Sequence, residues 1–342
     1  MTQVAILGTG LIGSSIALRL KAKSAIPDLE IVGFDRYRSA LQAARKIGAI
    51  DRAFDEPERA VEDAALVILS APVLSNHWLM DRIAPVLQPH TVVTDTGSTK
   101  AATMRHAAEV LPSQVAFVGG HPMAGKTETG AAAADPALFE GARWVIVPPR
   151  DAPERAIDAI AHIAESAGAE PMFMDAEEHD AYVAAISHLP MIAASALFRL
   201  ARASEAWPEL SLLAAGGFKD STRLAGSDPS MAYDLIVTNR DQIAHWIDRL
   251  RGGLEEMRER VLNVSGEEDL FKLLAQMEFE YAAYRNGKVG REVESTLSDL
   301  PSFDIGSFIM GEAIREKMRE ITRDQDERVK ERDARRRERR DV

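Results

Sequence analysis

The chain has 342 residues, no cysteine, and 53 acidic against 41 basic side chains, which gives a formal net charge of −12. This length suggests about two domains of roughly 100–200 residues each. The lack of cysteine excludes disulfide scaffolds, thiol nucleophiles and cysteine-ligated metal sites, and the acidic balance argues against nucleic acid as a partner.

The N-terminal residues run directly into an apolar, strand-like segment without a basic region, which is not the pattern of a signal peptide. The longest apolar stretch, residues 181–200, is nearly long enough to cross a bilayer. However, His188 and Pro190 lie in the middle of it, and Ser187 and Ser195 interrupt it. We therefore expect a buried helix here, a cytoplasmic protein and no membrane partner.

Short β-branched segments alternate with helical patterns over residues 1–175, which indicates parallel strands joined by crossover helices. Strands are predicted at residues 3–7, 30–35, 66–70, 91–94, 116–119, 143–147 and 171–174. Helices are predicted between them, at residues 14–23, 39–46, 75–86 and 153–167. The expected fold class is α/β, with an N-terminal Rossmann-type parallel-sheet domain that binds a dinucleotide.

Residues 176–285 show no convincing strand, and their long apolar segments at helical spacing are rich in Ala, Leu and Met. We predict an all-helical second domain. Helices as apolar as 181–200 and 210–218 need more cover than one small domain offers, so a homodimer is expected. Residues 286–342 form an extension whose charged end, from Arg319, is a solvated helix or a disordered tail.

A glycine-rich loop follows the first predicted strand and precedes a helix, as a dinucleotide fingerprint requires. Gly8 permits the tight turn, Gly10 lets the backbone approach a pyrophosphate, and Gly13 lets the helix pack on the strand. The helix N-terminus supplies free N–H groups for the phosphates. The candidate cofactor contacts in this loop are Gly8, Thr9, Gly10, Leu11, Ile12 and Gly13.

Asp35 ends the second predicted strand, 22 residues after Gly13, where a carboxylate can bond the adenosine ribose hydroxyls and repel a 2′-phosphate. NAD is therefore favoured over NADP, although Arg36, a further candidate contact, could accept that phosphate together with Arg38. Ser70, at the end of the third predicted strand, is also a candidate cofactor contact. The fingerprint alone does not separate a dehydrogenase from a synthase or a cofactor-sensing regulator.

Two polar loops follow later strands of the predicted sheet, where ligands bind in open parallel sheets. Residues 95–100 include Ser98, and the alternative interpretation is a helix N-cap by Ser98 or Thr99. In residues 119–125, His121 is framed by glycines and followed by proline. Its ordinary pKa near neutrality suits proton abstraction from an alcohol as hydride leaves, and a structural histidine is the alternative.

Two segments of the helical region also combine polar residues unusually. His188 lies in an apolar helix, either as a functional group or as a satisfied core histidine. Lys219 and Arg223 lie in residues 216–229, and arginine can grip a carboxylate through two parallel hydrogen bonds. The alternative is a charged turn capped by Ser227 or Asp228. No metal is expected, because the other histidines lack metal-ligand spacing: His77, His90, His106, His162, His179 and His245.

Together and in this order, these motifs resemble those of the prephenate/arogenate dehydrogenases of tyrosine biosynthesis. The resemblance covers about residues 1–285, and its most specific parts are the HPMAG sequence at 121–125 and residues 218–229. It implies oxidative decarboxylation of a small cyclohexadiene acid that carries carboxylates. For prephenate the products would be 4-hydroxyphenylpyruvate, CO2 and NADH, and the helical domain would be the dimer interface.

The same resemblance implies roles for single residues. His121 would take the hydroxyl proton, and Ser98 would help to orient His121 and that hydroxyl. His188 would line the substrate pocket and Arg223 would bind a carboxylate, while Lys219 adds positive field by its sequence position. The chain departs from the family pattern at Ala232, where relatives often carry Trp, and at residues 126–129.

Two other readings share the glycine loop. A β-hydroxyacid dehydrogenase also has a helical second domain, but that class usually places a lysine where this chain has His188. A dinucleotide-sensing protein without catalysis would tolerate the loss of His121, whereas an enzyme would lose orders of magnitude in rate.

Overall fold

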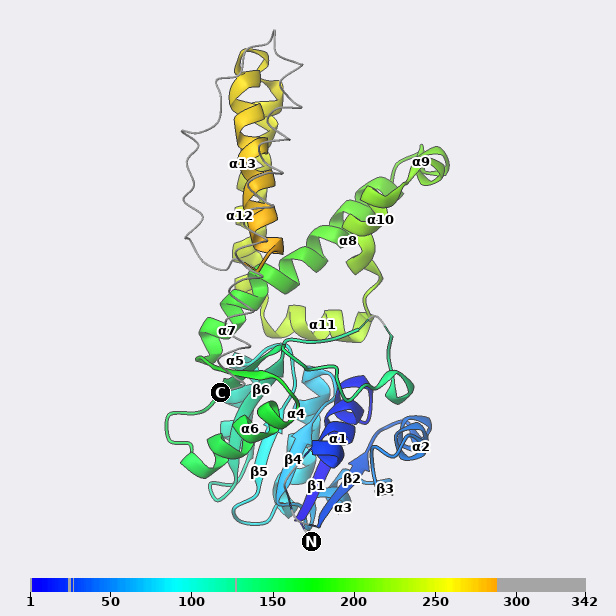
Figure 1. Cartoon of the computed structure of the whole chain (residues 1–342), viewed down its shortest axis with the longest axis vertical. Coiled ribbons are helices and arrows are strands. Elements are labelled where there is room, and N and C mark those ends of the chain that lie inside the picture. Colours follow the sequence, from blue (N-terminus) through cyan, green and yellow to red (C-terminus); the bar gives the residue numbers. More distant parts are fainter. Residues whose placement is uncertain (1, 24–25, 27, 127, 288–342) are drawn as a thin grey trace, which may run out of the picture. The chain divides into compact units, whose positions relative to one another are not determined.

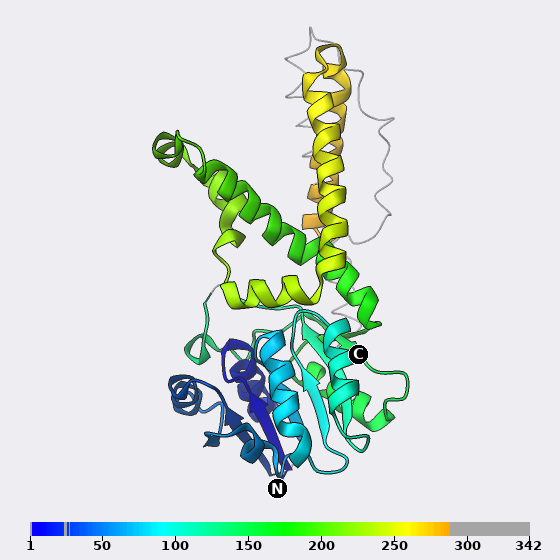
Figure 2. The ribbon, with the colours of Figure 1, turned by 180° about the vertical axis from the view of Figure 1, so that it is seen from behind.

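The computed structural model of the chain describes residues 2–23, 26, 28–126 and 128–287. It divides into two compact units, Met1–Asp248 and Arg249–Val342. The first unit contains a sheet domain followed by a helical segment (Figures 1 and 2). The predicted extension at 286–342 lies outside the described residues from residue 288 onward.

The sheet has eight strands in the order β3-β2-β1-β4-β5-β6-β7-β8. The strands are β1 (Thr2–Leu7), β2 (Leu29–Phe34), β3 (Arg52–Phe54), β4 (Leu66–Leu69), β5 (Val92–Asp95), β6 (Ala116–Pro122), β7 (Arg143–Val147) and β8 (Glu170–Phe173). Order and direction from β3 to β6 are those of a doubly wound fold, in which β1 and β4 lie side by side in the centre and the strand order reverses between them. The expected Rossmann-type domain is confirmed.

Helices cover both faces of the sheet, because successive strand residues point to opposite sides. Val4 and Ile6 of β1 face one buried cluster together with α1 (Leu11–Lys23), α2 (Arg38–Lys46) and α6 (Glu154–Ser166). Ala5 and Leu7 face the other cluster, with α3 (Pro57–Val61), α4 (Val73–Ile83) and α5 (Ala101–Val110). The continuous burial of β1 and β4 is typical of a parallel strand covered on both sides.

Two features of the sheet differ from the sequence prediction. The edge strand β3 was not predicted, since it has only three residues, of which Arg52 and Ala53 are exposed. The prediction of parallel strands throughout was wrong at one pair, because β6 and β7 run antiparallel, with His121 opposite Val145. The described residues of the connection, 123–126 and 128–142, contain a single 3-10 turn, Ala131–Ala133, and no crossover helix.

The segment after the sheet is helical, as predicted. It contains α7 (Ala176–Val183), a π-helical turn at Ala184–His188, α8 (Leu189–Arg202), α9 (Trp207–Leu213), α10 (Gly216–Thr222), a 3-10 turn at Arg223–Gly226 and α11 (Pro229–Thr238). Pro190 lacks the N–H of a regular helix, and the turn that precedes it widens into the π form. Helix α12 (Arg240–Leu262) begins in this unit, and the second unit contains its remainder and α13 (Glu267–Arg285).

The expectation of a buried helix at residues 181–200 is only partly met in the single chain. Met191 and Ala194 of α8 are buried, but Leu200 is 75% and Ile186 is 69% exposed. The continuous stretch Ala176–Arg202 is long and apolar enough to cross a membrane, which is weak evidence because core helices pass the same test. Among the described residues, no group of three or more His, Asp or Glu side chains is placed to hold a metal ion.

Candidate active site

The loop after β1 is shaped by its glycines. Gly8 has φ of +102°, a conformation that side chains with a Cβ atom rarely adopt. A Cβ atom at Gly13 would lie 2.1 Å from the carbonyl oxygen of Gly8, so only glycine allows α1 to pack this closely on the loop. At Gly10, by contrast, a Cβ atom would meet nothing within 4 Å, and the backbone faces open space.

Helix α1 points its N-terminus at that space. Its first internal hydrogen bond joins the N–H of Ser14 to the carbonyl of Gly10 at 3.1 Å. The N–H groups of Leu11, Ile12 and Gly13 therefore have no partner within the helix, and the first turn contains no acidic residue. Such a terminus can bind a phosphate group.

A cavity of about 710 Å³ opens beside this loop, within the size range of small-molecule sites. Five of the predicted cofactor residues line it: Gly8, Gly10, Asp35, Arg36 and Ser70. Thr9, Leu11, Ile12 and Gly13 do not line it and form the loop and first helical turn beside it. The helical segment contributes Asp228, which precedes α11, and Ser230 and Asp234, which lie within α11.

Asp35 is held at the end of β2 by the glycine loop. Its Oδ2 accepts hydrogen bonds from the backbone N–H of Thr9 at 2.8 Å and from the Thr9 hydroxyl at 3.3 Å, and its Oδ1 accepts from the N–H of Tyr37 at 3.0 Å. Arg36 lies over the Tyr37 ring, 4.8 Å from its centroid. The cavity thus has a fixed carboxylate on one wall, as expected for a ribose site.

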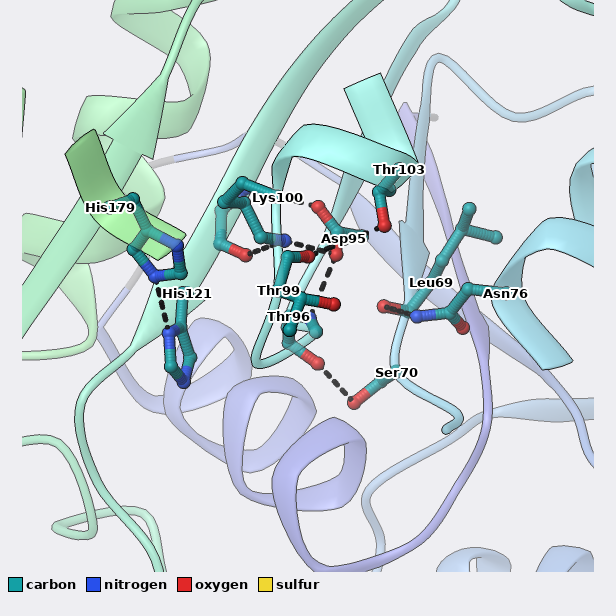
Figure 3. A network of polar contacts seen from close by, with 12 residues as sticks. Leu69, Ser70, Asn76, Asp95, Thr96, Thr99, Lys100, Thr103, His121 and His179 are labelled. Atoms are coloured by element: carbon teal, nitrogen blue, oxygen red, sulfur yellow. Dashed lines mark hydrogen bonds and ion pairs between the residues drawn. The ribbon is translucent and has the colours of Figure 1, made fainter. Parts of the chain in front are cut away.

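A buried ion pair between Lys100 and Asp95 connects the loop after β5 to the last residue of β5 (Figure 3). Lys100 also donates to the carbonyl of Gly120 at 2.8 Å, and Asp95 accepts from the N–H groups of Gly97 at 2.8 Å and Gly120 at 3.2 Å. Burial lowers the pKa of Lys100, and the Asp95 carboxylate opposes this shift. These bonds fix the backbone immediately before His121.

His121 lies at the carboxyl end of β6, on the same edge of the sheet as the glycine loop. A Cβ atom at Gly119 or Gly120 would approach Met104 to 2.9 Å or the Asp95 carbonyl to 2.6 Å, which explains the glycines that frame it. Desolvation lowers the pKa of His121 well below its usual value, and the nearby charge of Lys100 adds to this effect. The ring is therefore neutral at neutral pH and can accept a proton.

The side chain of His121 is held by α7. Its Nδ1 lies 2.8 Å from Nε2 of His179, with the two rings edge to face (Figure 3). The Nδ1 of His179 in turn lies 2.8 Å from Oδ1 of Asp180, and both α7 side chains are buried. Neither His179 nor Asp180 could be assigned a role from the sequence, because only the fold brings α7 beside β6.

His188 is buried in the π-helical turn, with 1% of its surface exposed. The side-chain N–H group of Asn239 lies 3.3 Å from its Nδ1 and donates also to the carbonyl of Asp180 at 2.8 Å. The Nε2 of His188 has no hydrogen-bond partner among the residues that the structure describes. Burial lowers the pKa of His188 to about 4, so the ring is neutral and Nε2 carries a hydrogen without an acceptor.

The N-cap alternative for Ser98 and Thr99 is wrong. Lys100 occupies the N-cap position of α5 without a side-chain cap, and the Thr99 hydroxyl instead contacts that of Thr238 at 2.8 Å. Ser98 is partly exposed and has no hydrogen-bond partner among the described residues. Its hydroxyl is therefore available to a ligand.

Within the described chain, no hydrogen bond or ion pair connects Lys219 or Arg223 with His121. They belong to α10 and the following turn, which pack on α8 and lie away from the sheet in both views (Figures 1 and 2). Both are exposed and have no ion pair with any described residue. The alternative reading of this segment is confirmed in one respect, since Asp228 caps α11 through bonds at 3.0 Å from the N–H groups of Ser230 and Met231.

Comparison with known proteins gives the family. A family model described as "Prephenate dehydrogenase, nucleotide-binding domain" matches residues 16–172, and one described as "Prephenate dehydrogenase, dimerization domain" matches residues 175–276. The chain belongs to the prephenate dehydrogenase family. The glycine loop at 8–13 precedes the first match, and its assignment depends on the geometry described above.

Relatives within the prephenate dehydrogenase family are similar over most of the chain. A prephenate dehydrogenase of Bacillus subtilis is 36% identical over 257 residues, 75% of this chain and 69% of the relative. A cyclohexadienyl dehydrogenase of Zymomonas mobilis is 31% identical over 266 residues, 77% and 90% of the two chains. The crystal structure of prephenate dehydrogenase from A. aeolicus with hydroxyphenyl propionate and NAD+ has a TM-score of 0.76 at 28% identity, and the match covers 82% of this chain and 97% of that one.

Proposed function

We propose that this protein catalyses the NAD-dependent oxidative decarboxylation of prephenate in tyrosine biosynthesis. The observation that carries the proposal is the position of His121, a neutral histidine at the carboxyl end of β6, on the sheet edge where the glycine loop and Asp35 form a dinucleotide cavity. Membership of the prephenate dehydrogenase family and the names of its relatives support the choice of substrate.

The residues of the cavity fit NAD. Open space at Gly10 and the unpaired N–H groups of Leu11, Ile12 and Gly13 suit a pyrophosphate. The Asp35 carboxylate can accept bonds from ribose hydroxyls and would repel a 2′-phosphate, so we propose NAD rather than NADP. NAD+, when bound, supplies the hydride acceptor.

The chain's own residues handle the proton. His121 accepts the proton of the ring hydroxyl while hydride leaves the carbon that bears it. The ring carboxylate then leaves as CO2 and its bonding electrons complete the aromatic ring, so that the phenolic oxygen takes the proton back from His121. Ser98 lies in the loop that the buried Asp95 pair anchors beside β6, and we propose that its hydroxyl orients the reacting oxygen.

Three side chains are proposed to bind the substrate's acceptor groups. The unpaired Nε2–H of His188 is buried and needs an acceptor, which a substrate oxygen can supply. Arg223 and Lys219 lack ion pairs within the described chain, so their charge is available to a carboxylate. We expect Arg223→Ala to raise the KM for prephenate more than it lowers kcat.

We also propose a homodimer assembled through the helical region at 176–285, and a cytoplasmic location. The dimerization-domain match covers 175–276, and the exposed apolar side chains of α8 and α9 lie within it. Leu200, Leu212 and Leu213 are 75–86% exposed in the single chain. A second copy that covers them would remove an apolar surface unusual for a monomer in water.

Steady-state assays test the proposed function. Purified protein is given prephenate or arogenate, each with NAD+ or NADP+, and formation of reduced cofactor and CO2 is measured. We expect the highest kcat/KM with prephenate and NAD+. Failure to oxidise prephenate with either cofactor would refute the proposal, and a comparable kcat/KM for arogenate would make it a cyclohexadienyl dehydrogenase.

The variant His121→Asn tests the catalytic residue. Loss of the general base should lower kcat by about 10²–10⁴-fold. NAD+ affinity, measured by fluorescence titration, should change little because His121 does not line the dinucleotide cavity. An unchanged rate would exclude His121 as the base and favour the non-catalytic interpretation.

A further inference from the structure

We propose that His179 and Asp180 are positioning residues that select the nitrogen of His121 that accepts the substrate's proton. The inference rests on the proposed function, in which His121 is the base. Its support is the unbroken line of hydrogen bonds from the buried Asp180 carboxylate through His179 to His121, with 2.8 Å at each step.

The donors and acceptors in this line can be assigned from the carboxylate outward. An ionised carboxylate only accepts, so the Nδ1 of His179 carries the hydrogen that points to Asp180. We infer that the His179 ring is neutral, in which case its other nitrogen is an acceptor and Nε2 accepts from Nδ1–H of His121. The lone pair of His121 is thereby left on Nε2, the only ring nitrogen that the line does not use.

Asp180 is itself held in one orientation by three further hydrogen bonds. Its Oδ1 accepts from the backbone N–H of Lys100 at 2.7 Å and its Oδ2 from that of Ala101 at 2.9 Å, at the start of α5. Its carbonyl accepts from Asn239 at 2.8 Å. The carboxylate therefore caps a helix of the sheet domain and orients His179 at the same time, so docking of α7 on α5 fixes the ring of the base.

The line also balances the charge that forms during the reaction. When the hydroxyl O–H bond breaks and the Nε2–H bond of His121 forms, both Nδ1 hydrogens stay in place and the ring becomes an imidazolium. Burial, and then the charge of Lys100, disfavour a positive charge there. Asp180 is the negative group connected to that ring by hydrogen bonds, and we infer that it stabilises the imidazolium through His179.

Variants of His179 test this role. His179→Ala removes the acceptor for Nδ1–H, so His121 can adopt the other tautomer and kcat should fall by about 10–100-fold, less than for loss of the base itself. The acid limb of the kcat–pH profile should move to lower pH, because the protonated ring of His121 has lost the hydrogen-bond acceptor that stabilises it. His179→Gln places an amide oxygen near the position of Nε2 and should recover several-fold of the kcat lost in His179→Ala.

Thr238→Val is the matched control, because it removes another polar contact between the helical segment and the loop before α5, the one to Thr99, without touching the line. It should keep the wild-type kcat and pH profile. If His179→Ala behaves like Thr238→Val, the proposed positioning role is wrong while the dehydrogenase function stands. Loss of activity in both variants without a shift of the profile would assign His179 a structural role only.

A measurement on the wild-type protein tests the inference directly and does not require a His179 variant to fold. In ¹⁵N-histidine NMR spectra of the wild-type protein at pH 7.5, with the resonances of His121 assigned by their absence in His121→Asn, Nδ1 should be protonated and Nε2 should not. The opposite tautomer would overturn the inference whatever the assays show. This readout also separates the inference from the proposed function, since it needs no turnover.

Discussion

Asp234 of α11 accepts a hydrogen bond at 2.9 Å from the backbone N–H of Leu74, the second residue of α4, across 160 residues of sequence. Asp180 likewise accepts hydrogen bonds from the backbone N–H groups of Lys100 and Ala101 at the start of α5. The N-cap positions of these two helices are occupied by Pro72 and Lys100, which provide no side-chain cap. Two carboxylates of the helical segment therefore satisfy the helix termini of the sheet domain, and docking and capping are the same contact.

We expect Asp234→Ala to lower the free energy of unfolding by about 1–2 kcal/mol, as for other lost N-caps. The amide of Leu74 should also exchange faster with deuterium, since it loses its acceptor. Asp175→Ala is the control, because Asp175 caps its own helix α7 through Glu178 at 2.7 Å. Asp175→Ala should lower the free energy of unfolding by a similar amount but leave the Leu74 amide protected from exchange. Equal exchange of that amide in both variants would contradict the capping of α4 by Asp234.

The glycines of the fingerprint should separate into a folding role and a binding role. Gly13→Ala places a methyl group 2.1 Å from a backbone oxygen and should destabilise the fold by about 1–3 kcal/mol or more. Gly10→Ala meets no atom, so stability in urea should change by no more than about 0.5 kcal/mol. The KM for NAD+ should nevertheless rise at least about tenfold, a loss of about 1.4 kcal/mol of binding, and an unchanged KM would remove Gly10 from the pyrophosphate site.

Acid should destabilise the protein through histidines that are neutral in the folded state. Burial, together with the neighbouring His106, lowers the pKa of His77 to about 4, and burial lowers that of His188 to about 4. Both values lie below the 6.5 of an unfolded histidine, so the unfolded state binds more protons between pH 6.5 and 4. Stability is complete above pH 6.5 and is lost as the pH falls through that window, by at most about 3 kcal/mol for His188. The loss is smaller for His77, because water screens this partly exposed ring.

The variant His77→Gln isolates one part of this effect. His77 stacks on His106 at 4.6 Å and contacts the Thr103 hydroxyl at 3.1 Å, so Gln keeps a polar group without a titrating ring. The urea midpoint of this variant should fall less than that of the wild type between pH 7 and pH 5. An identical fall in both proteins would mean that His77 does not contribute.

The exposed leucines of α9 should decide the oligomeric state. Leu212 and Leu213 are 86% and 80% exposed, and a charge at either position would have to be buried in the proposed dimer. We expect Leu212→Glu to sediment as a monomer at micromolar concentration. Phe173→Glu on the edge strand β8, a residue 54% exposed in the sheet domain, should remain a dimer. A monomeric wild-type protein would contradict the proposal.

Much of the sheet domain can be predicted from local patterns. Residues 3–7 and 153–167 were expected as a strand and a helix, and the structure has β1 at Thr2–Leu7 and α6 at Glu154–Ser166. The direction of β7 could not be predicted, because an apolar run such as 143–147 looks the same in parallel and antiparallel pairs. The connection decides the direction, and the described part of the connection from β6 to β7 contains no crossover helix.

The candidate site divides in the same way. The sequence alone determined the glycine loop and Asp35, because both depend on spacing within one strand–loop–helix unit. It also placed His121 near the end of a strand, although it predicted that strand to end at residue 119 and β6 extends to Pro122. The tertiary structure decided that His179 and Asp180 of α7 reach His121, which lies 58 residues before His179. It also decided that Lys100 is buried against Asp95 rather than free for a ligand. A hydrogen bond between distant segments leaves no periodic pattern in the sequence. Only the packing of the folded chain shows that His179, among several histidines, contacts His121.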